Sequence, residues 1–83
     1  MPLNEPSVQR IPRIGDIVLY HQFDAGRMFS LAALVARVER AGDPRSGLFL
    51  TVFRPGRTPE PHNFATPFAE EPTNGYWGWR EGD

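Results

Sequence analysis

Short runs rich in apolar and β-forming residues recur along this chain, separated by polar, proline- and glycine-containing stretches, and that pattern is typical of short β-strands joined by turns. Residues 48–54 (LFLTVFR) form the clearest run, with apolar side chains on both faces, which indicates a central strand or one covered on both sides. Residues 17–21 (IVLYH) are rich in β-branched and aromatic residues and predict a first strand. Shorter strands are predicted around residues 62–65 and 76–80.

Residues 31–40 (LAALVARVER) fit two patterns. Their leucines and valines have the i, i+3, i+4, i+7 spacing of an amphipathic helix, and alanine and arginine favour a helix. The same stretch also alternates as a half-buried strand does, with Leu34 and Val38 facing away from Val35 and Arg37. The local pattern therefore leaves a strand and a short helix both open, and the strand-like neighbours favour the strand.

Nine prolines and eight glycines divide the chain into short pieces, which suits short strands joined by turns. Residues 1–12 contain three of the prolines and are predicted to form an extended arm. Residues 22–30 are expected to form a loop that bends at Gly26. We predict one mainly β domain over residues 13–83, either a small SH3-like barrel or a curled antiparallel sheet of four or five strands.

The runs IPRIGDIVLYH, LAALVARVE, GLFLTVFRPG and GYWGWRE together resemble a loose group of small phage-encoded proteins. The shared pattern is a G-D-[IV]-V-x-Y opening, an A-[AI]-[IV]-x-x-V strand, an L-x-V-F-x-x-G strand and a W-x-W-like ending. The resemblance covers residues 11–81 and implies an SH3-like barrel, a strand at residues 31–40 and an intracellular role in a phage or prophage. It implies no catalytic residues, and the alanine-rich stretch SLAALVARVERAG departs from it.

Chain length and composition limit the class of protein further. A chain of 83 residues buries about 60–65% of its unfolded surface, so we expect association with further copies in a homo-oligomer. The absence of cysteine excludes disulfides and thiolate metal sites and fits a reducing, cytoplasmic setting. The resemblance to phage proteins implies that this is the cytoplasm of an infected or lysogenic host cell. No apolar run of about 18 residues and no apolar signal-peptide core occur, so no membrane association is expected.

The charges are balanced and spread out. The net charge is −1, and all nine basic residues are arginines scattered along the chain, so binding to duplex nucleic acid is disfavoured. Without lysine there can be no P-loop lysine and no Schiff base. The two histidines have no metal-ligand spacing, and no G-x-S-x-G motif occurs. We therefore expect no catalytic residues, no metal and no cofactor.

The stretch NGYWGWREGD contains both tryptophans of the chain. On a strand Trp77 and Trp79 share one face, so they either fill the core or form a stacking surface. Arg54 and Arg57 flank a Pro-Gly turn, across which two guanidinium groups can converge on an anion. The predicted ligand-binding set joins these four to three residues expected at the same rim: Tyr20, His21 and Arg80.

These residues suit two kinds of non-enzymatic function. The first is stoichiometric capture of a nucleotide-type small molecule, such as a host immune messenger, with arginines on phosphates and indoles on bases. The alternative is a protein-interaction module or a small structural component of a phage. Binding to single-stranded nucleic acid also suits tryptophan and arginine, but the net charge of −1 opposes it.

Overall fold

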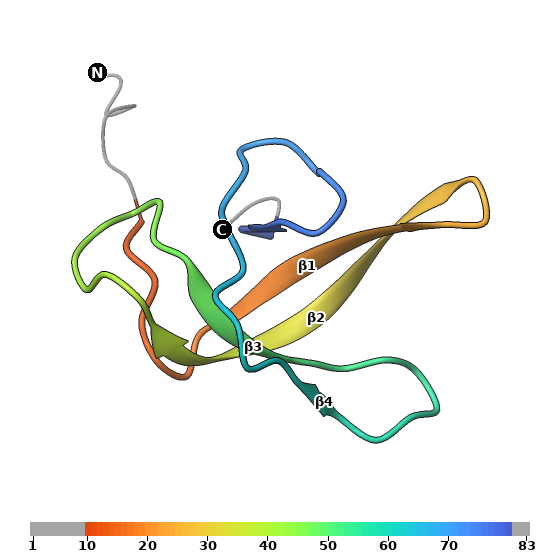
Figure 1. Cartoon of the computed structure of the whole chain (residues 1–83), viewed down its shortest axis with the longest axis horizontal. Coiled ribbons are helices and arrows are strands. Elements are labelled where there is room, and N and C mark those ends of the chain that lie inside the picture. Colours follow the sequence, from red (N-terminus) through yellow and green to blue (C-terminus); the bar gives the residue numbers. More distant parts are fainter. Residues whose placement is uncertain (1–9, 81–83) are drawn as a thin grey trace, which may run out of the picture.

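The computed structural model of the protein describes residues 10–80, so most of the predicted arm lies outside the described residues. Five strands form one antiparallel sheet, and no helix occurs in the described range. The strands are β1 (Ile17–Asp24), β2 (Arg27–Val38), β3 (Leu48–Val52), β4 (Glu60–Pro61) and β5 (Trp77–Gly78). Their order across the sheet is β4-β3-β2-β1-β5 (Figure 1). The prediction of a mainly β chain with a curled antiparallel sheet is confirmed.

The ambiguous residues 31–40 belong mostly to β2, and a β-bulge explains their helix-like spacing. The pairing of β2 with β3 shifts register after Val35, so Ala36 has no partner residue on β3. Before the shift, Leu31 and Val35 face the core, and after it Val38 does. An extra residue in one strand reverses the alternation of side chains. The inward positions are therefore Leu31, Ala33, Val35 and Val38, and the larger side chains among them lie four and three residues apart, as they would on a helix.

The prediction of a loop at residues 22–30 is wrong, because β1 and β2 extend through these residues and are joined by a tight turn. The two strands stay paired as far as Asp24 and Arg27. The turn consists of Ala25 and Gly26, whose φ angles are 53° and 80°, and such left-handed pairs match the twist of a hairpin. Polar residues are interspersed with the apolar ones at this end, and together with Gly26 they hid the strand pattern. The hairpin extends well beyond the rest of the sheet (Figure 1).

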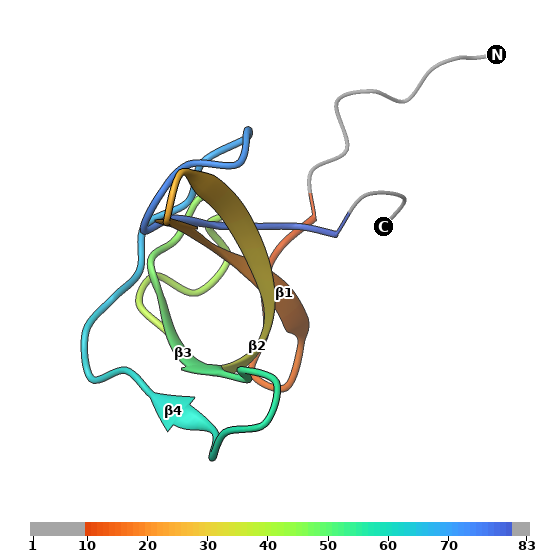
Figure 2. The ribbon, with the colours of Figure 1, turned by 90° about the vertical axis from the view of Figure 1, so that its right-hand side faces the viewer.

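The core lies on the inner face of the curled sheet (Figure 2). Its fully buried members come from β1, β2, β3 and β5: Val18, Ala33, Val35, Leu48, Leu50, Val52 and Trp77. The Trp77 indole packs at a ring-centroid distance of 4.7 Å from Phe68 and donates from Nε1 to the Ser46 carbonyl at 3.0 Å. Burial with a satisfied N–H is the arrangement that stabilises an interior indole.

An irregular segment spans the gap between the two sides of the sheet. Leu48 on β3 exchanges two backbone hydrogen bonds with Thr66, at 2.8 and 3.0 Å. Trp77 on β5 donates to the carbonyl of Pro67 and accepts from the amide of Ala69. The strand predicted near residues 62–65 is thus replaced by the short β4 and this bridging segment. The last strand is shorter than predicted, because β5 covers only Trp77 and Gly78.

Candidate functional site

The structure divides the predicted ligand-binding residues among separate places. Trp77 is buried in the core, so its indole has no face free for stacking. Tyr20, Arg54 and Arg57 lie on the side of β4, whereas His21 and Trp79 line a cleft beside β5. Arg80 is exposed in the segment after Trp79. The single arginine and tryptophan rim expected from the sequence is therefore not assembled in one place.

Arg54 is held by two side chains and bridges three parts of the fold. Its Nε donates to Glu60 Oε1 on β4 at 3.0 Å, and its Nη1 donates to Gln22 Oε1 on β1 at 2.7 Å. The hydrogen bond from Arg54, together with its charge, lowers the pKa of the Glu60 carboxyl below its usual value. Much of the hydrogen-bonding capacity of this guanidinium is therefore used within the fold.

An aromatic row adjoins this bridge. The His62 imidazole stacks on Phe64 at a centroid distance of 4.8 Å, and Tyr20 meets it edge-on at 5.3 Å. The Nε2 atom of His62 lies 3.7 Å from Glu60 Oε1. Its buried Nδ1 has no hydrogen-bond partner among residues 10–80. The Phe64 ring is 51% exposed and forms the outer end of the row. The row therefore offers an aromatic surface next to Arg54.

Arg57 lies at the rim of a cleft of about 490 Å³. The cleft is lined by the turn and by β4, including Arg54, Thr58 and Glu60. The Arg57 side chain is exposed, and within the described residues it forms no hydrogen bond or ion pair. Because Glu60 neutralises Arg54 locally, Arg57 supplies the available positive charge of this cleft.

His21 is 4% exposed, and its Nδ1 lies 2.9 Å from Ser30 Oγ across the β1–β2 pair. Burial lowers the pKa of this imidazole below its usual value, which favours the neutral ring at pH 7. His21 and Ser30 line a cleft of about 460 Å³ together with Glu70, Glu71 and Trp79.

The half-buried Trp79 meets Trp77 edge-on at 5.3 Å, and the Arg10 guanidinium lies 4.2 Å from its ring centroid. One indole thus remains partly accessible in this cleft, and an arginine already contacts it. No group of three histidine, aspartate or glutamate side chains in residues 10–80 is arranged to hold a metal ion. Nor does the described part contain a helix able to cross a membrane.

Sequence reasoning missed an apolar surface on the outer face of the sheet. The side chains that alternate with the core residues of β1 and β2 lie in paired rows, Ile17 with Leu34, Leu19 with Ala32, and Phe23 with Met28. Ile17, Phe23 and Met28 are 39–55% exposed, and Phe53 beyond the end of β3 is 38% exposed. We call these seven residues the outer apolar face. The signal was present in the sequence as apolar residues on both faces of its strands.

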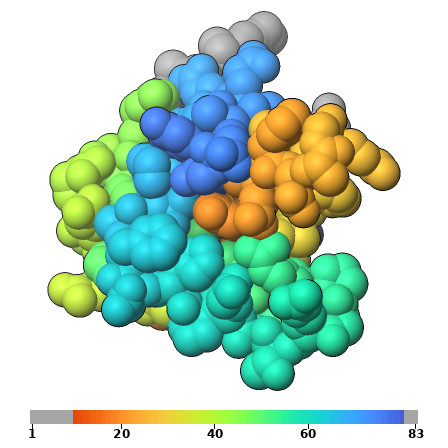
Figure 3. Space-filling model, turned by 45° about the vertical axis from the view of Figure 1, so that its right-hand side comes forward, coloured from red at the N-terminus to blue at the C-terminus, as the bar shows by residue number. Residues whose placement is uncertain are grey.

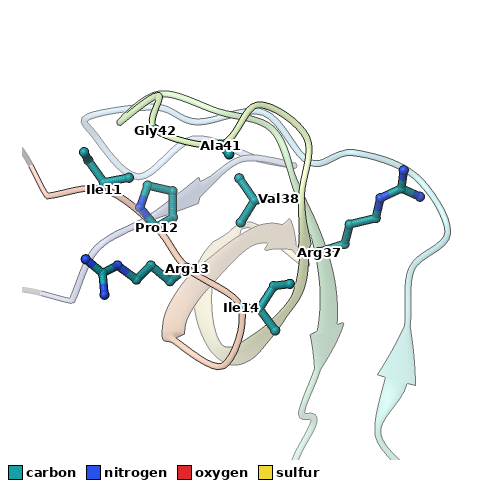
Figure 4. A pocket seen from close by; sticks show the side chains of 8 residues that line it. All are labelled: Ile11, Pro12, Arg13, Ile14, Arg37, Val38, Ala41 and Gly42. Atoms are coloured by element: carbon teal, nitrogen blue, oxygen red, sulfur yellow. The ribbon is translucent and has the colours of Figure 1, made fainter.

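A second apolar feature is a groove of about 680 Å³ between residues 11–14 and the end of β2 (Figure 4). Ile11, Pro12, Ile14 and Val38 supply much of its lining, and Ile14 is 70% exposed. The guanidinium groups of the two lining arginines point away from each other to opposite sides (Figure 4). The groove therefore presents an apolar floor without a converging pair of cations.

Comparison of the chain with protein-family models, with curated proteins and with solved structures found no match. The chemistry of the described surface is thus the basis for any assignment of function.

Proposed function

We propose that this protein is a non-enzymatic interaction module whose partner is another protein. The outer apolar face carries this proposal. Ile17, Phe23, Met28 and Phe53 are large apolar side chains that face solvent on one side of one sheet. Several large apolar side chains exposed on one face of a small domain mark contacts with proteins. Because these side chains are 38–55% exposed, covering each of them should gain roughly half of the ~1.5–3 kcal/mol of full burial, and several together can dominate binding.

The proposal explains why the apolar surface is organised in cross-strand rows. The residues of each pair, Ile17 with Leu34 and Phe23 with Met28, stand directly opposite each other, so each pair forms a cross-strand apolar row. The polar pair of His21 and Ser30 separates the Phe23 row from the rows of Leu19 and Ile17. A partner with a complementary apolar strip could cover both strands at once. Under this proposal the protein acts stoichiometrically in the cytoplasm of an infected or lysogenic cell, or as a small component of a phage particle.

Site-specific photo-crosslinking tests the proposal. A photoreactive phenylalanine at position 17 or 53 should crosslink to a defined protein in the host cell, and one at the exposed Thr58 should not. With the partner purified, Ile17→Lys should weaken its binding by at least about tenfold, while Thr58→Lys leaves binding unchanged. Crosslinking of equal strength from all three positions, or none from position 17 and 53, would contradict an outer-face partner.

Capture of an anionic small molecule is a second candidate, and Arg57 favours it. Its exposed side chain lines the cleft beside Arg54 and forms no ion pair within the described residues. The exposed Phe64 ring lies at the end of the aromatic row that begins at Tyr20, and such a ring can stack on a base. Several copies would be needed to enclose a nucleotide-type ligand, because the cleft of one copy is shallow.

Thermal melting with added nucleotides distinguishes small-molecule capture from the protein-interaction module. Cyclic di- and trinucleotides and ADP-ribose derivatives, added one at a time, should raise the melting temperature if one of them binds. Arg57→Ala should remove the shift, and Trp79→Ala should preserve it, because Trp79 lines the other cleft. Absence of a shift with every nucleotide would end the capture hypothesis and leave the interaction module unaffected.

A further inference from the structure

The β1–β2 hairpin has an unpaired edge. The pairing of β2 with β3 ends at Ala33 and Val52, and one further bond runs from the Phe53 amide to the Ala32 carbonyl at 2.9 Å. Beyond this bond β3 turns away from β2 (Figure 1). The hairpin end and residues 53–61 then form separate projections (Figure 3). Within the described residues, positions 27–31 of β2 pair with β1 on one side and with no strand on the other.

Along β2, the backbone N–H and C=O groups of successive residues point alternately toward β1 and toward the free edge. The Val35 amide donates to the Asp16 carbonyl on the side of β1, whereas the Ala32 carbonyl accepts from the Phe53 amide on the side of β3. In an antiparallel sheet alternate residues direct both N–H and C=O to the same side. Ser30 and Met28 therefore direct their amides and carbonyls outward, like Ala32. Residues 27–31 contain no proline and no bulge, and their one charged residue, Arg27, lies at the turn end of the stretch. Such an edge is a template for a further strand.

We propose that this edge pairs with the same edge of a second copy of this chain, antiparallel and centred on Phe29. The free stretch of β2 is symmetric about Phe29, because its two outward-directed residues, Met28 and Ser30, lie one position to either side. With the two-fold axis at Phe29, Met28 of each copy faces Ser30 of the other, and four backbone hydrogen bonds form. The two hairpins then make one four-stranded sheet.

The two ends of the unpaired stretch of β2 favour a two-fold axis at Phe29 over one at a neighbouring residue. The turn at Ala25 and Gly26 bounds it on one side, and the bond from Phe53 to Ala32 bounds it on the other. A centre at Met28 would place Ser30 opposite the turn, and a centre at Ser30 would place Met28 opposite the occupied Ala32. Only the centre at Phe29 uses both outward-directed residues of each copy.

The side chains and the charge of the edge are compatible with a second copy. Phe29 is 39% exposed and lies with the half-buried Leu31 on the inner face, while Met28 is 40% exposed on the other. In the paired edges the two Phe29 rings stand opposite each other without backbone bonds between them, which is the closer kind of cross-strand contact. The charged residue of the free stretch is Arg27, whose guanidinium lies 5.4 Å from the Phe29 ring centroid of the same copy. With the axis at Phe29, each Arg27 faces Leu31 of the other copy, so the two like charges do not stand directly opposite each other. This inference goes beyond the proposed function, because Met28 is the one residue of the outer apolar face at the paired edge and the other six lie away from it.

Sedimentation analysis of the full chain tests the inference. We expect a concentration-dependent dimer that Met28→Pro abolishes. Proline is tolerated on an edge strand when the lost N–H pointed to solvent, so the hairpin should persist, as circular dichroism would show. Ile17→Lys, which alters the outer apolar face on β1, should leave the dimer intact. A wild-type chain that stays monomeric up to about 1 mM, or a dimer lost in Ile17→Lys and kept in Met28→Pro, would overturn the inference.

Charge variants test the register without proline. Phe29→Lys and Phe29→Glu should each weaken the dimer by about tenfold or more, because like charges then face each other across the axis. An equimolar mixture of the two variants should recover dimer formation. In the wild type, hydrogen exchange at the Met28 and Ser30 amides should slow as concentration rises, and exchange at the Phe29 amide should not change. Failure of the mixture to recover, with unchanged exchange at both amides, contradicts pairing at this edge.

Discussion

His21 lies on β1 opposite Ser30 and beside the backbone of β5. A Cβ atom at position 78 would stand 3.3 Å from His21 Nε2 and 3.4 Å from the Ala69 carbonyl oxygen. Gly78 thus leaves the space that the imidazole occupies. The sequence suggested His21 for a ligand rim, and it does line a cleft. Its burial, however, depends on a glycine 57 positions away in the sequence, which no local pattern could show.

Stability should fall as the pH falls below about 6.5, because of His21. Burial lowers the pKa of its imidazole in the folded state, so the unfolded chain binds more protons between the folded pKa and the unfolded value near 6.5. The contribution is fully present above this window and is lost as the pH falls through it. Urea unfolding at pH 7.5 and 5.5 measures the change.

His21→Gln is the matched control for this pH dependence. The variant loses the titrating ring, so its free energy of unfolding should change less between the two pH values than that of the wild type. Asp43 and Glu60, whose carboxyl pKa values are lowered by Arg40 and Arg54 respectively, lose their contribution only at a more acidic pH. An identical slope in the variant would show that other groups cause the dependence.

The two tryptophans should differ sharply in their contribution to stability. Trp77 is fully buried and bonded to Ser46, whereas Trp79 is half-buried at the edge of the core. Trp77→Phe should lower the free energy of unfolding by about 2–3 kcal/mol, because it leaves a cavity and an unpaired carbonyl. Trp79→Phe should cost under about 1 kcal/mol. Urea unfolding followed by circular dichroism measures both.

Fluorescence supplies an independent check on the tryptophans. The variant that retains only Trp77 should emit at shorter wavelength and resist quenching by acrylamide, and the variant that retains only Trp79 should be quenched readily. Equal quenching of the two variants would contradict the placement of Trp77 in the core. The sequence predicted that the two indoles lie on one face of a strand, but it left open which of them is buried in the core.

At the scale of elements, the turn between β1 and β2 contains one residue under strain. Ala25 has a φ of 53°, a left-handed conformation that costs a residue with a Cβ about 1–2 kcal/mol. Asparagine tolerates this conformation, and Asn-Gly is the preferred pair for such hairpin turns. Ala25→Asn should therefore raise the free energy of unfolding by about 0.5–1 kcal/mol. Urea unfolding measures this gain.

Gly26→Ala serves as the opposite control for the turn. Gly26 has a φ of 80° with open space around it, so a methyl group adds backbone strain without a clash. The variant should lose about 1 kcal/mol. If Ala25→Asn instead lowered stability while Gly26→Ala had no effect, the hairpin would not form this turn in solution.

The elements that the sequence predicted best are those whose patterning is local. Residues 48–54 are a short run rich in apolar and β-forming residues between two turns, and β3 occupies Leu48–Val52 within them. The bulge in β2 is set by its pairing with β3, so a helix-like spacing remained possible until the partner strand was known. The hairpin was taken for a loop because Gln22, Asp24 and Arg27 weakened its alternation. Tertiary pairing decided each of these outcomes, as it commonly does for β-sheets.

At the scale of the whole molecule, the sequence predicted the fold class but not the arrangement of the candidate site. Arg54 and Arg57 do lie near each other, as expected for the first and last residues of a four-residue turn. Trp79 and His21 lie elsewhere, because β5 joins the far edge of the sheet beside β1. Which face of a strand points outward depends on the curl of the sheet, so the outer apolar face became visible only in three dimensions.

The pairing of β5 with β1 also has a kinetic consequence. Strands β1, β2 and β3 follow one another and can pair early through short connections, since closing short loops costs little entropy. The contact between Tyr20 and Trp77 closes a loop of 57 residues, and contacts of such long range slow the folding of β proteins. Docking of Trp77 should therefore be the late step of folding. Until Trp77 docks, the inner apolar face of strands β1 to β3 is exposed, and the partly folded molecule is then in its most aggregation-prone state.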